Sequence, residues 1–245
     1  MVPVQTIAAF DQNRAMHDFH LDSGLLIAVL QIILIDILLG GDNAVVIALA
    51  CRRLPPRQRN MGIFWGVFGA IGLRIVLIFF AVQLLALPFL KIVGALLLLY
   101  IGVQLLLPEK QDEPDIKASD HLLTAIRTII IADAVMSLDN VIAIAGAADG
   151  HIGLVAMGIA ISVPIIVWGS KLVMALMDRY PVVIVFGGAL LGWIAGGLWI
   201  DDHALDALQD SLPHWTDYLF SVLGALLVVL IGRLIVLRRR QSAEA

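Results

Sequence analysis

The chain has 245 residues, of which 60% are hydrophobic and only 15% charged, and its mean hydropathy is +0.96. A soluble domain carries about a quarter charged residues, so this composition excludes an ordinary soluble protein and predicts an integral membrane protein. The single cysteine excludes an intramolecular disulfide and a cysteine-rich metal site. The formal net charge of −4 decides little, because membrane proteins segregate charge between the two sides of the bilayer.

Seven apolar runs are long enough to cross a bilayer as helices, each of which needs about 20 residues. In chain order they occupy 24–50, 61–86, 89–107, 121–148, 152–177, 181–200 and 216–237. Prolines or charged residues separate them. Pro164 lies inside the fifth run and is expected to kink that helix without ending it. The predicted fold class is therefore all-α, a polytopic membrane protein with seven transmembrane helices.

Basic residues in the loops indicate the orientation of the chain. Arginines follow the first run and return in the C-terminal tail: Arg52, Arg53, Arg57, Arg59, Arg238, Arg239 and Arg240. Six predicted spans separate these two segments, so both lie on one side of the membrane. The N-terminus is therefore expected outside and the C-terminus in the cytoplasm, with the chain in a bacterial inner (plasma) membrane.

One polar pattern occurs twice inside apolar runs, and the second copy begins 97 residues after the first. The copies are Asp36, Asp42 and Asn43, and Asp133, Asp139 and Asn140. A carboxylate at bilayer depth is costly, so four in a matched pattern indicate a function. At the same offset Arg74 aligns with Lys171, which predicts that a buried cation recurs as well.

These matches predict two three-helix units, with the seventh helix outside the repeat. Because each unit has three helices, the second starts from the opposite side of the membrane, and the repeat is inverted, as in many secondary transporters. The predicted organisation is an extracytoplasmic segment (1–23), a first repeat (24–107), a cytoplasmic linker (108–120), a second repeat (121–200), an extracytoplasmic loop (201–215), and the seventh helix with a basic tail (216–245).

Helical periodicity separates the motif residues into two groups. Residues seven apart share a helix face, whereas residues six apart do not. One stripe then carries Asp36 and Asn43 in the first copy, and Asp133, Ser137 and Asn140 in the second. Asp42 and Asp139 join these stripes only if the helix unwinds locally. The pair Gly40-Gly41 permits unwinding in the first copy, whereas Ser137-Leu138 in the second favours a more regular helix.

Carboxylate, amide and carbonyl oxygens suit Mg²⁺, Ca²⁺ or Mn²⁺ far better than Cu⁺ or Zn²⁺. The predicted metal ligands are Asp36, Asp42, Asn43, Asp133, Asp139 and Asn140, with Arg74 and Lys171 as counter-charges. Four aspartates against these two cations leave a charge of −2, which one divalent cation neutralises. An empty site would favour protonated carboxylates, which offers a route to metal/proton exchange.

Two shorter patterns predict local structure. Asp202, Asp206 and Asp210 follow helical spacing between the last two runs, which favours a solvated amphipathic segment. Glycines recur every three or four residues at the start of the second run and predict close helix packing: Gly62, Gly66, Gly69 and Gly72.

The segment Gly41–Leu49, with its Asp-Asn pair and small apolar residues, together with its duplication in a seven-helix chain, resembles the TerC family of the LysE-like exporter group. The resemblance covers about Leu25 to Leu237. It implies export of a divalent ion, Mn²⁺ first, with the family's acidic residues at the six motif positions. The transported ion is then a substrate, and neither a prosthetic group nor a nucleic-acid partner is expected. The oligomeric state is left open.

Two other functions compete with transport. Some TerC relatives are thought to assist assembly or metallation of exported proteins, which is the main alternative. The other is an intramembrane aspartyl protease, since two membrane aspartates could share a proton. Such proteases need Gly-x-Gly-Asp, whereas this chain has Leu39-Gly40-Gly41-Asp42 and no glycine in the second copy. The chain is therefore not expected to be an enzyme.

Overall fold

The computed structural model describes residues 30, 33, 41–85, 87–107, 118–147, 152–209, 211–213 and 215–244. The side chains of several further helical residues, including Asp139 and Asn140, are outside this description. Asp36 and Gly40 are also outside it, as is most of the first predicted span.

The described residues are almost entirely helical and contain no strand, which confirms the all-α prediction for this part of the chain. The helices are Gly41–Cys51, α3 (Pro56–Leu85), α4 (Leu90–Leu106), α5 (Ala118–Ala147), α6 (Ile152–Arg179), α7 (Val182–Ile200) and α9 (Trp215–Glu244), with a short 3₁₀ turn, η1 (His203–Leu205), and α8 (Asp206–Gln209) before α9. Five of them, α3, α5, α6, α7 and α9, are long and apolar enough to cross a membrane.

Several helix boundaries differ from the sequence prediction, and the last helix ends at Glu244, not at residue 237. The second helix begins at Pro56, not at residue 61, because proline is well suited to the first position of a helix, where its missing N–H is not needed. The fourth begins at Ala118, inside the predicted linker. The fifth helix continues through Pro164, as expected.

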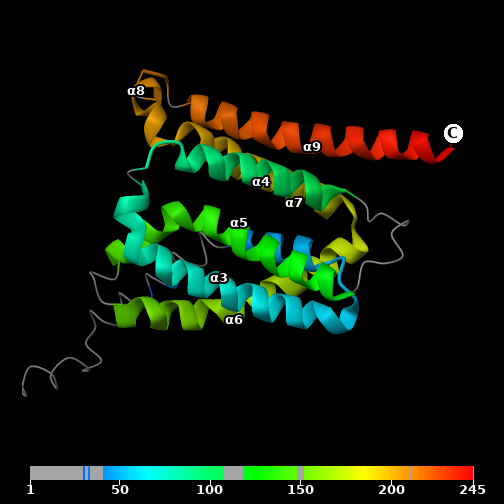
Figure 1. Ribbon diagram of the computed structural model, residues 1–245, viewed down its shortest axis with the longest axis horizontal. Coiled ribbons are helices and arrows are strands. Elements are labelled where there is room, and N and C mark those ends of the chain that lie inside the picture. Colours follow the sequence, from blue (N-terminus) through cyan, green and yellow to red (C-terminus); the bar gives the residue numbers. More distant parts are fainter. Residues whose placement is uncertain are drawn as a thin grey trace, which may run out of the picture.

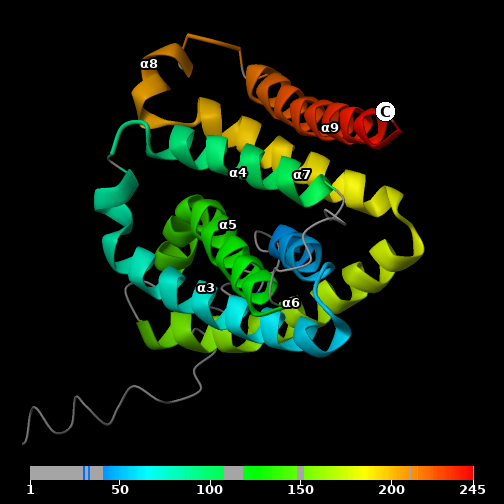
Figure 2. The ribbon, with the colours of Figure 1, turned by 45° about the vertical axis from the view of Figure 1, so that its right-hand side comes forward.

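The helices form two groups that pack against each other (Figures 1 and 2). One group consists of α4, α7 and α9, and the other of α3, α5 and α6. Contacts of α4 with α5 and of α6 with α7 join them. The helix Gly41–Cys51 lies in the interior beside α5 and α6 (blue in Figure 2), and residues 46–51 are all buried. Asp42 and Asn43, the described residues of the first Asp-Asn copy, thus belong to a helix that lies beside two longer ones.

Glycines allow the closest helix contacts. At Gly192, Gly196 and Gly224 an added methyl group would meet the backbone of the facing helix in the α7–α9 pair. At Gly62, Gly66 and Gly69 it would meet side chains that include those of α5. Small residues let helix backbones approach where lipid gives no hydrophobic drive for association. The prediction of close packing along α3 is thus confirmed at these three positions, whereas Gly72 has nothing within 4 Å.

A carboxylate from a distant segment caps the N-terminus of α4. Asp202 is fully buried; its Oδ1 accepts hydrogen bonds from the N–H groups of Phe89 and Ala204 at 2.8 Å, and its Oδ2 from those of Lys91 at 2.8 Å and Ile92 at 3.1 Å. Burial alone would raise the pKa of this carboxyl, but the four N–H donors outweigh it and hold the pKa below its ordinary value. The expectation of a solvated segment is therefore wrong for Asp202, because α4 requires a cap.

Guanidinium groups cap the other end of α4. Arg52 donates to the carbonyl of Leu105 at 2.9 Å, and Arg53 donates to those of Gln104 at 2.9 Å and of Leu107. An anion at the N-terminus and cations at the C-terminus both complement the helix dipole. With 17 residues, α4 is about 25 Å long at 1.5 Å per residue, shorter than the hydrocarbon core of about 30 Å. Charged caps can therefore reach both of its ends.

Arg59 adds further contacts at the end of the bundle that holds Arg52 and Arg53, which we call the arginine-rich end. Its guanidinium donates to the carbonyl oxygens of Arg52 and Leu54 and forms an exposed ion pair with Asp178 at 3.1 Å. The pair joins the start of α3 to the end of α6. The C-terminal end of α9 lies at the same end of the bundle (Figure 1).

Candidate functional site

A buried ion pair joins α3 to α5 within the group formed by α3, α5 and α6. Nη2 of Arg74 donates to Oδ1 of Asp133 at 2.7 Å, and both side chains are less than 10% exposed. Nε of Arg74 donates to Oγ of Ser137 at 3.1 Å, and this hydroxyl donates to Oδ2 of Asp133 at 3.2 Å. Asp133 and Ser137 are one helical turn apart, so both face Arg74. The three side chains form a closed triangle.

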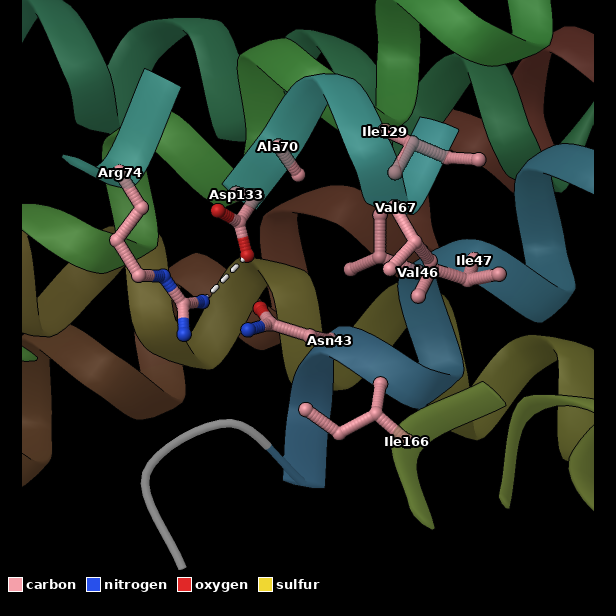
Figure 3. A pocket seen from close by; sticks show the side chains of 9 residues that line it. All are labelled: Asn43, Val46, Ile47, Val67, Ala70, Arg74, Ile129, Asp133 and Ile166. Atoms are coloured by element: carbon pink, nitrogen blue, oxygen red, sulfur yellow. Dashed lines mark hydrogen bonds and ion pairs between the residues drawn. The ribbon is translucent and has the colours of Figure 1, made fainter. Parts of the chain in front are cut away.

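The side chain of Asn43 lies beside this triangle. Asn43 is 3% exposed, and neither its Oδ1 nor its Nδ2 has a hydrogen-bond partner among the residues that the structure describes. Leaving a buried polar atom unsatisfied costs about 1–3 kcal/mol, and such groups in native proteins call for an explanation. Figure 3 shows the amide directed towards Arg74 and Asp133. The amide therefore offers an oxygen ligand and a donor to a molecule or ion at this place.

A small cavity adjoins these groups. It has a volume of about 30 Å³, and one water needs at least about 10–15 Å³ on the same measure. Among the described residues, its polar lining is Asn43, Arg74 and Asp133, and its apolar lining is Val46, Ile47, Val67, Ala70, Ile129 and Ile166 (Figure 3). The space therefore suits a single ion or one to two waters, and three helices supply its described charged and amide groups.

The apolar lining was not singled out from the sequence, although a signal exists. Val46 and Ile47 follow Asn43 by one turn, Ala70 precedes Arg74 by one turn, and Ile129 precedes Asp133 by one turn. All of them lie on the side of the polar cluster that leads to the arginine-rich end. Helical spacing from the motif residues would have found them.

The other aspartate of the first copy is only partly enclosed. Asp42 is half-buried, and its Oδ1 accepts a hydrogen bond from the N–H of Asn43 at 2.9 Å. Gly41 is already helical, and the fate of Gly40 is outside the described residues, so the predicted break is untested. Helix α5 continues through Ser137 without interruption, as expected for the second copy.

Of the six predicted ligands, three have described side chains: Asp42, Asn43 and Asp133. Asp36 and the side chains of Asp139 and Asn140 are outside the described part. Within that part, no three histidine, cysteine or acidic side chains come together as a metal site. The structure brings Asn43, Asp133, Ser137 and Arg74 to one place.

Lys171 is exposed on α6, so the expectation of a second buried cation is wrong. Its neighbour Ser170 is fully buried and donates to the carbonyl of Val167 at 2.8 Å. Adjacent residues on a helix point about 100° apart. The buried stripe of α6 runs through Ser162, Ser170, Met174 and Met177, so the same helix rotation that buries Ser170 turns Lys171 outwards.

Comparison with known proteins places this site within a family. The chain matches the family described as "Integral membrane protein TerC family" over residues 21–242. It belongs to this family. The matched region includes both copies of the Asp-Asn pattern and Arg74, so the whole cluster lies within the TerC match. No solved structure matches the chain.

Among similar proteins, the uncharacterized membrane protein YjbE of Bacillus subtilis (strain 168) is 47% identical over 206 residues, covering 84% of this chain and 93% of YjbE. The membrane protein YceF of the same organism is 24% identical, covering 82% of this chain and 79% of its own length. The UPF0053 protein YegH of Escherichia coli (strain K12) is 21% identical over 91% of this chain but only 45% of YegH. These likenesses support a bacterial integral membrane protein.

Proposed function

We propose that this TerC protein exports a divalent metal cation, Mn²⁺ first, from the cytoplasm through the site beside Asn43. The observation that carries the proposal is the buried Asn43 amide, which has no hydrogen-bond partner in the described part of the chain and faces a cavity of about 30 Å³ next to a carboxylate. Amide and carboxylate oxygens are ligands for hard divalent cations such as Mg²⁺, Ca²⁺ and Mn²⁺. The ligand set is completed, in this proposal, by Asp36, Asp42, Asp139 and Asn140.

Charge supports exchange of the cation against protons. Because Lys171 is exposed, Arg74 is the one predicted counter-charge that stays buried, and a proposed site made of the four motif aspartates and Arg74 carries a formal charge of −3. Outward transport of a divalent cation against an inside-negative potential costs about 4.6 kcal/mol per 100 mV, twice the single-charge value. Two protons moving inwards cancel this electrical cost, and a third makes the potential favour export. We therefore propose a metal/proton antiporter.

The arrangement of the helices supports an inverted repeat. The helix Gly41–Cys51 and α5 run in opposite directions, as do α3 and α6, and α4 and α7 (Figure 1). The contacts of α4 with α7 and of α3 with α6 each join equivalent helices of the two units. Inverted repeats place the substrate near the midplane and permit access from alternate sides. We propose this arrangement, with the arginine-rich end in the cytoplasm, as the basis of export.

Metal uptake by proteoliposomes tests the proposal. Purified wild-type protein should transport Mn²⁺, and Asn43→Ala should reduce the rate at least tenfold. Asn60→Ala removes an exposed amide on α3 and is the matched control, with an expected rate equal to wild type. Equal Mn²⁺ flux through Asn43→Ala and Asn60→Ala would reject the site. Absence of flux in the wild type, with metal delivered instead to an exported apo-enzyme, would favour the metallation-factor alternative.

Proton coupling has its own test. At a fixed membrane potential, Mn²⁺ flux should rise when the imposed pH gradient drives protons in the opposite direction and fall when it is reversed. An Mn²⁺ flux that does not change with the imposed pH gradient would rule out antiport. The protease alternative requires two carboxylates that share a proton, whereas Asp133 is paired with Arg74, and we do not propose it.

A further inference from the structure

The guanidinium of Arg74 forms an ion pair with the carboxylate of Asp133, which borders the candidate cation site. It donates to Asp133 at 2.7 Å and to Ser137 at 3.1 Å, and all three side chains are buried. Arg74 and Asp133 line the same small cavity as the Asn43 amide. A cation bound beside Asn43 would therefore share Asp133 with Arg74, at close range and in an enclosed setting.

We infer that Arg74 is a tethered competitor of the transported cation, holding Asp133 when the site is empty and yielding it when the cation binds. This inference rests on the proposed export function. An unpaired buried carboxylate is strongly unfavourable, so Arg74 leaves Asp133 only as another cation takes its place. The return of Arg74 then assists release of the cation. A site with this competitor binds more weakly and turns over faster than the same site without it.

Ser137 positions the competitor. Its hydroxyl accepts a hydrogen bond from Nε of Arg74 and donates one to Oδ2 of Asp133. Ser137, one turn after Asp133 on α5, therefore fixes the orientation of the two charged groups relative to each other. Without the hydroxyl the pair remains but is less well oriented. Ser137→Ala is therefore expected to act in the same direction as loss of the arginine charge, and more weakly.

The test compares Mn²⁺ binding and transport by four proteins: wild type, Arg74→Gln, Arg74→Lys and Arg74→Gln combined with Asp133→Asn. Binding is measured by the rise in melting temperature of the detergent-solubilised protein with MnCl₂. Arg74→Gln should bind Mn²⁺ at least tenfold more tightly than wild type, with a lower KM and a lower kcat in proteoliposomes. Arg74→Lys keeps the charge and should restore both towards wild type. The double variant should lose the gain in affinity.

A merely structural arginine predicts the opposite pattern. Arg74→Gln would then be less stable, Mn²⁺ would not restore its stability preferentially, and its KM would be unchanged or higher; this result overturns the inference. If Arg74→Gln does not fold, Ser137→Ala is the deciding variant. Ser170→Ala is its control, because the Ser170 side chain is equally buried but its hydroxyl, among the described residues, bonds to its own helix at Val167. A Ser137→Ala protein with wild-type KM and kcat would also overturn it. Wild-type protein that neither binds nor transports Mn²⁺ would reject the export function itself.

Discussion

Removing the charge of Asp202 should destabilise the bundle by detaching α4 from the segment after α7. In Asp202→Asn, one oxygen can still accept from Phe89 and Ala204, but an NH₂ group replaces the acceptor for the N–H groups of Lys91 and Ile92. An unsatisfied buried donor costs about 1–3 kcal/mol, so two such donors predict a loss of about 2–6 kcal/mol in the free energy of unfolding. This loss is large, because folded domains are stable by only about 5–15 kcal/mol.

The free energy of unfolding can be measured in mixed micelles by titration with SDS, with helix content followed by circular dichroism. The matched control is Asp201→Asn, which removes a neighbouring exposed carboxylate and should change stability by less than about 0.5 kcal/mol. The effect should also depend on pH. Because the folded-state pKa of Asp202 lies below its unfolded value of about 3.9, its contribution is fully present above pH 4 and is lost as the pH falls through the folded-state pKa.

The difference in the free energy of unfolding between wild type and Asp202→Asn should therefore become smaller as the pH of the titration is lowered. Equal stability of Asp202→Asn and Asp201→Asn at pH 7 would refute the capping account. A stability difference that stayed constant down to pH 2 would refute the role of the ionised carboxylate while leaving a packing role for the side chain.

Two further substitutions test the packing and capping of the helices. Gly196→Ala places a methyl group against the backbone carbonyl of Phe220, so α9 should separate from α7 and stability should fall by about 1–3 kcal/mol; Gly197→Ala, which meets only a side-chain oxygen at 3.4 Å, should be tolerated in the same SDS titration. Arg53→Met should cost about 1–3 kcal/mol through the lost bonds to the last carbonyls of α4, and faster hydrogen exchange confined to the C-terminal turn of α4 would identify this cause.

Much of the fold could be predicted because the bilayer acts on each helix separately. The hydrophobic length of a span, the prolines and charges between spans, and the cost of a carboxylate inside one are properties of short segments. They predicted the helices from α3 to α9 and directed attention to Asn43, Asp133 and Arg74. The grouping of the helices was not predicted: α3 packs with α5 and α6, and α4 packs with α7 and α9, so each group draws helices from both predicted three-helix units.

Which side chains meet was decided by the tertiary structure. Lys171 was expected inside and lies outside, because a helix rotation of one residue is invisible to hydropathy but changes every neighbour. Asp202 was expected in solvent and is buried, because its carboxylate caps the N-terminus of α4, which is distant in the sequence. The pairing of Arg74 with Asp133 spans 59 residues, and the bonds of Asp202 to the start of α4 span more than 100. The sequence by itself determined that charged groups would lie in the membrane; packing of three helices determined which were paired, and that the amide of Asn43 was left facing a cavity.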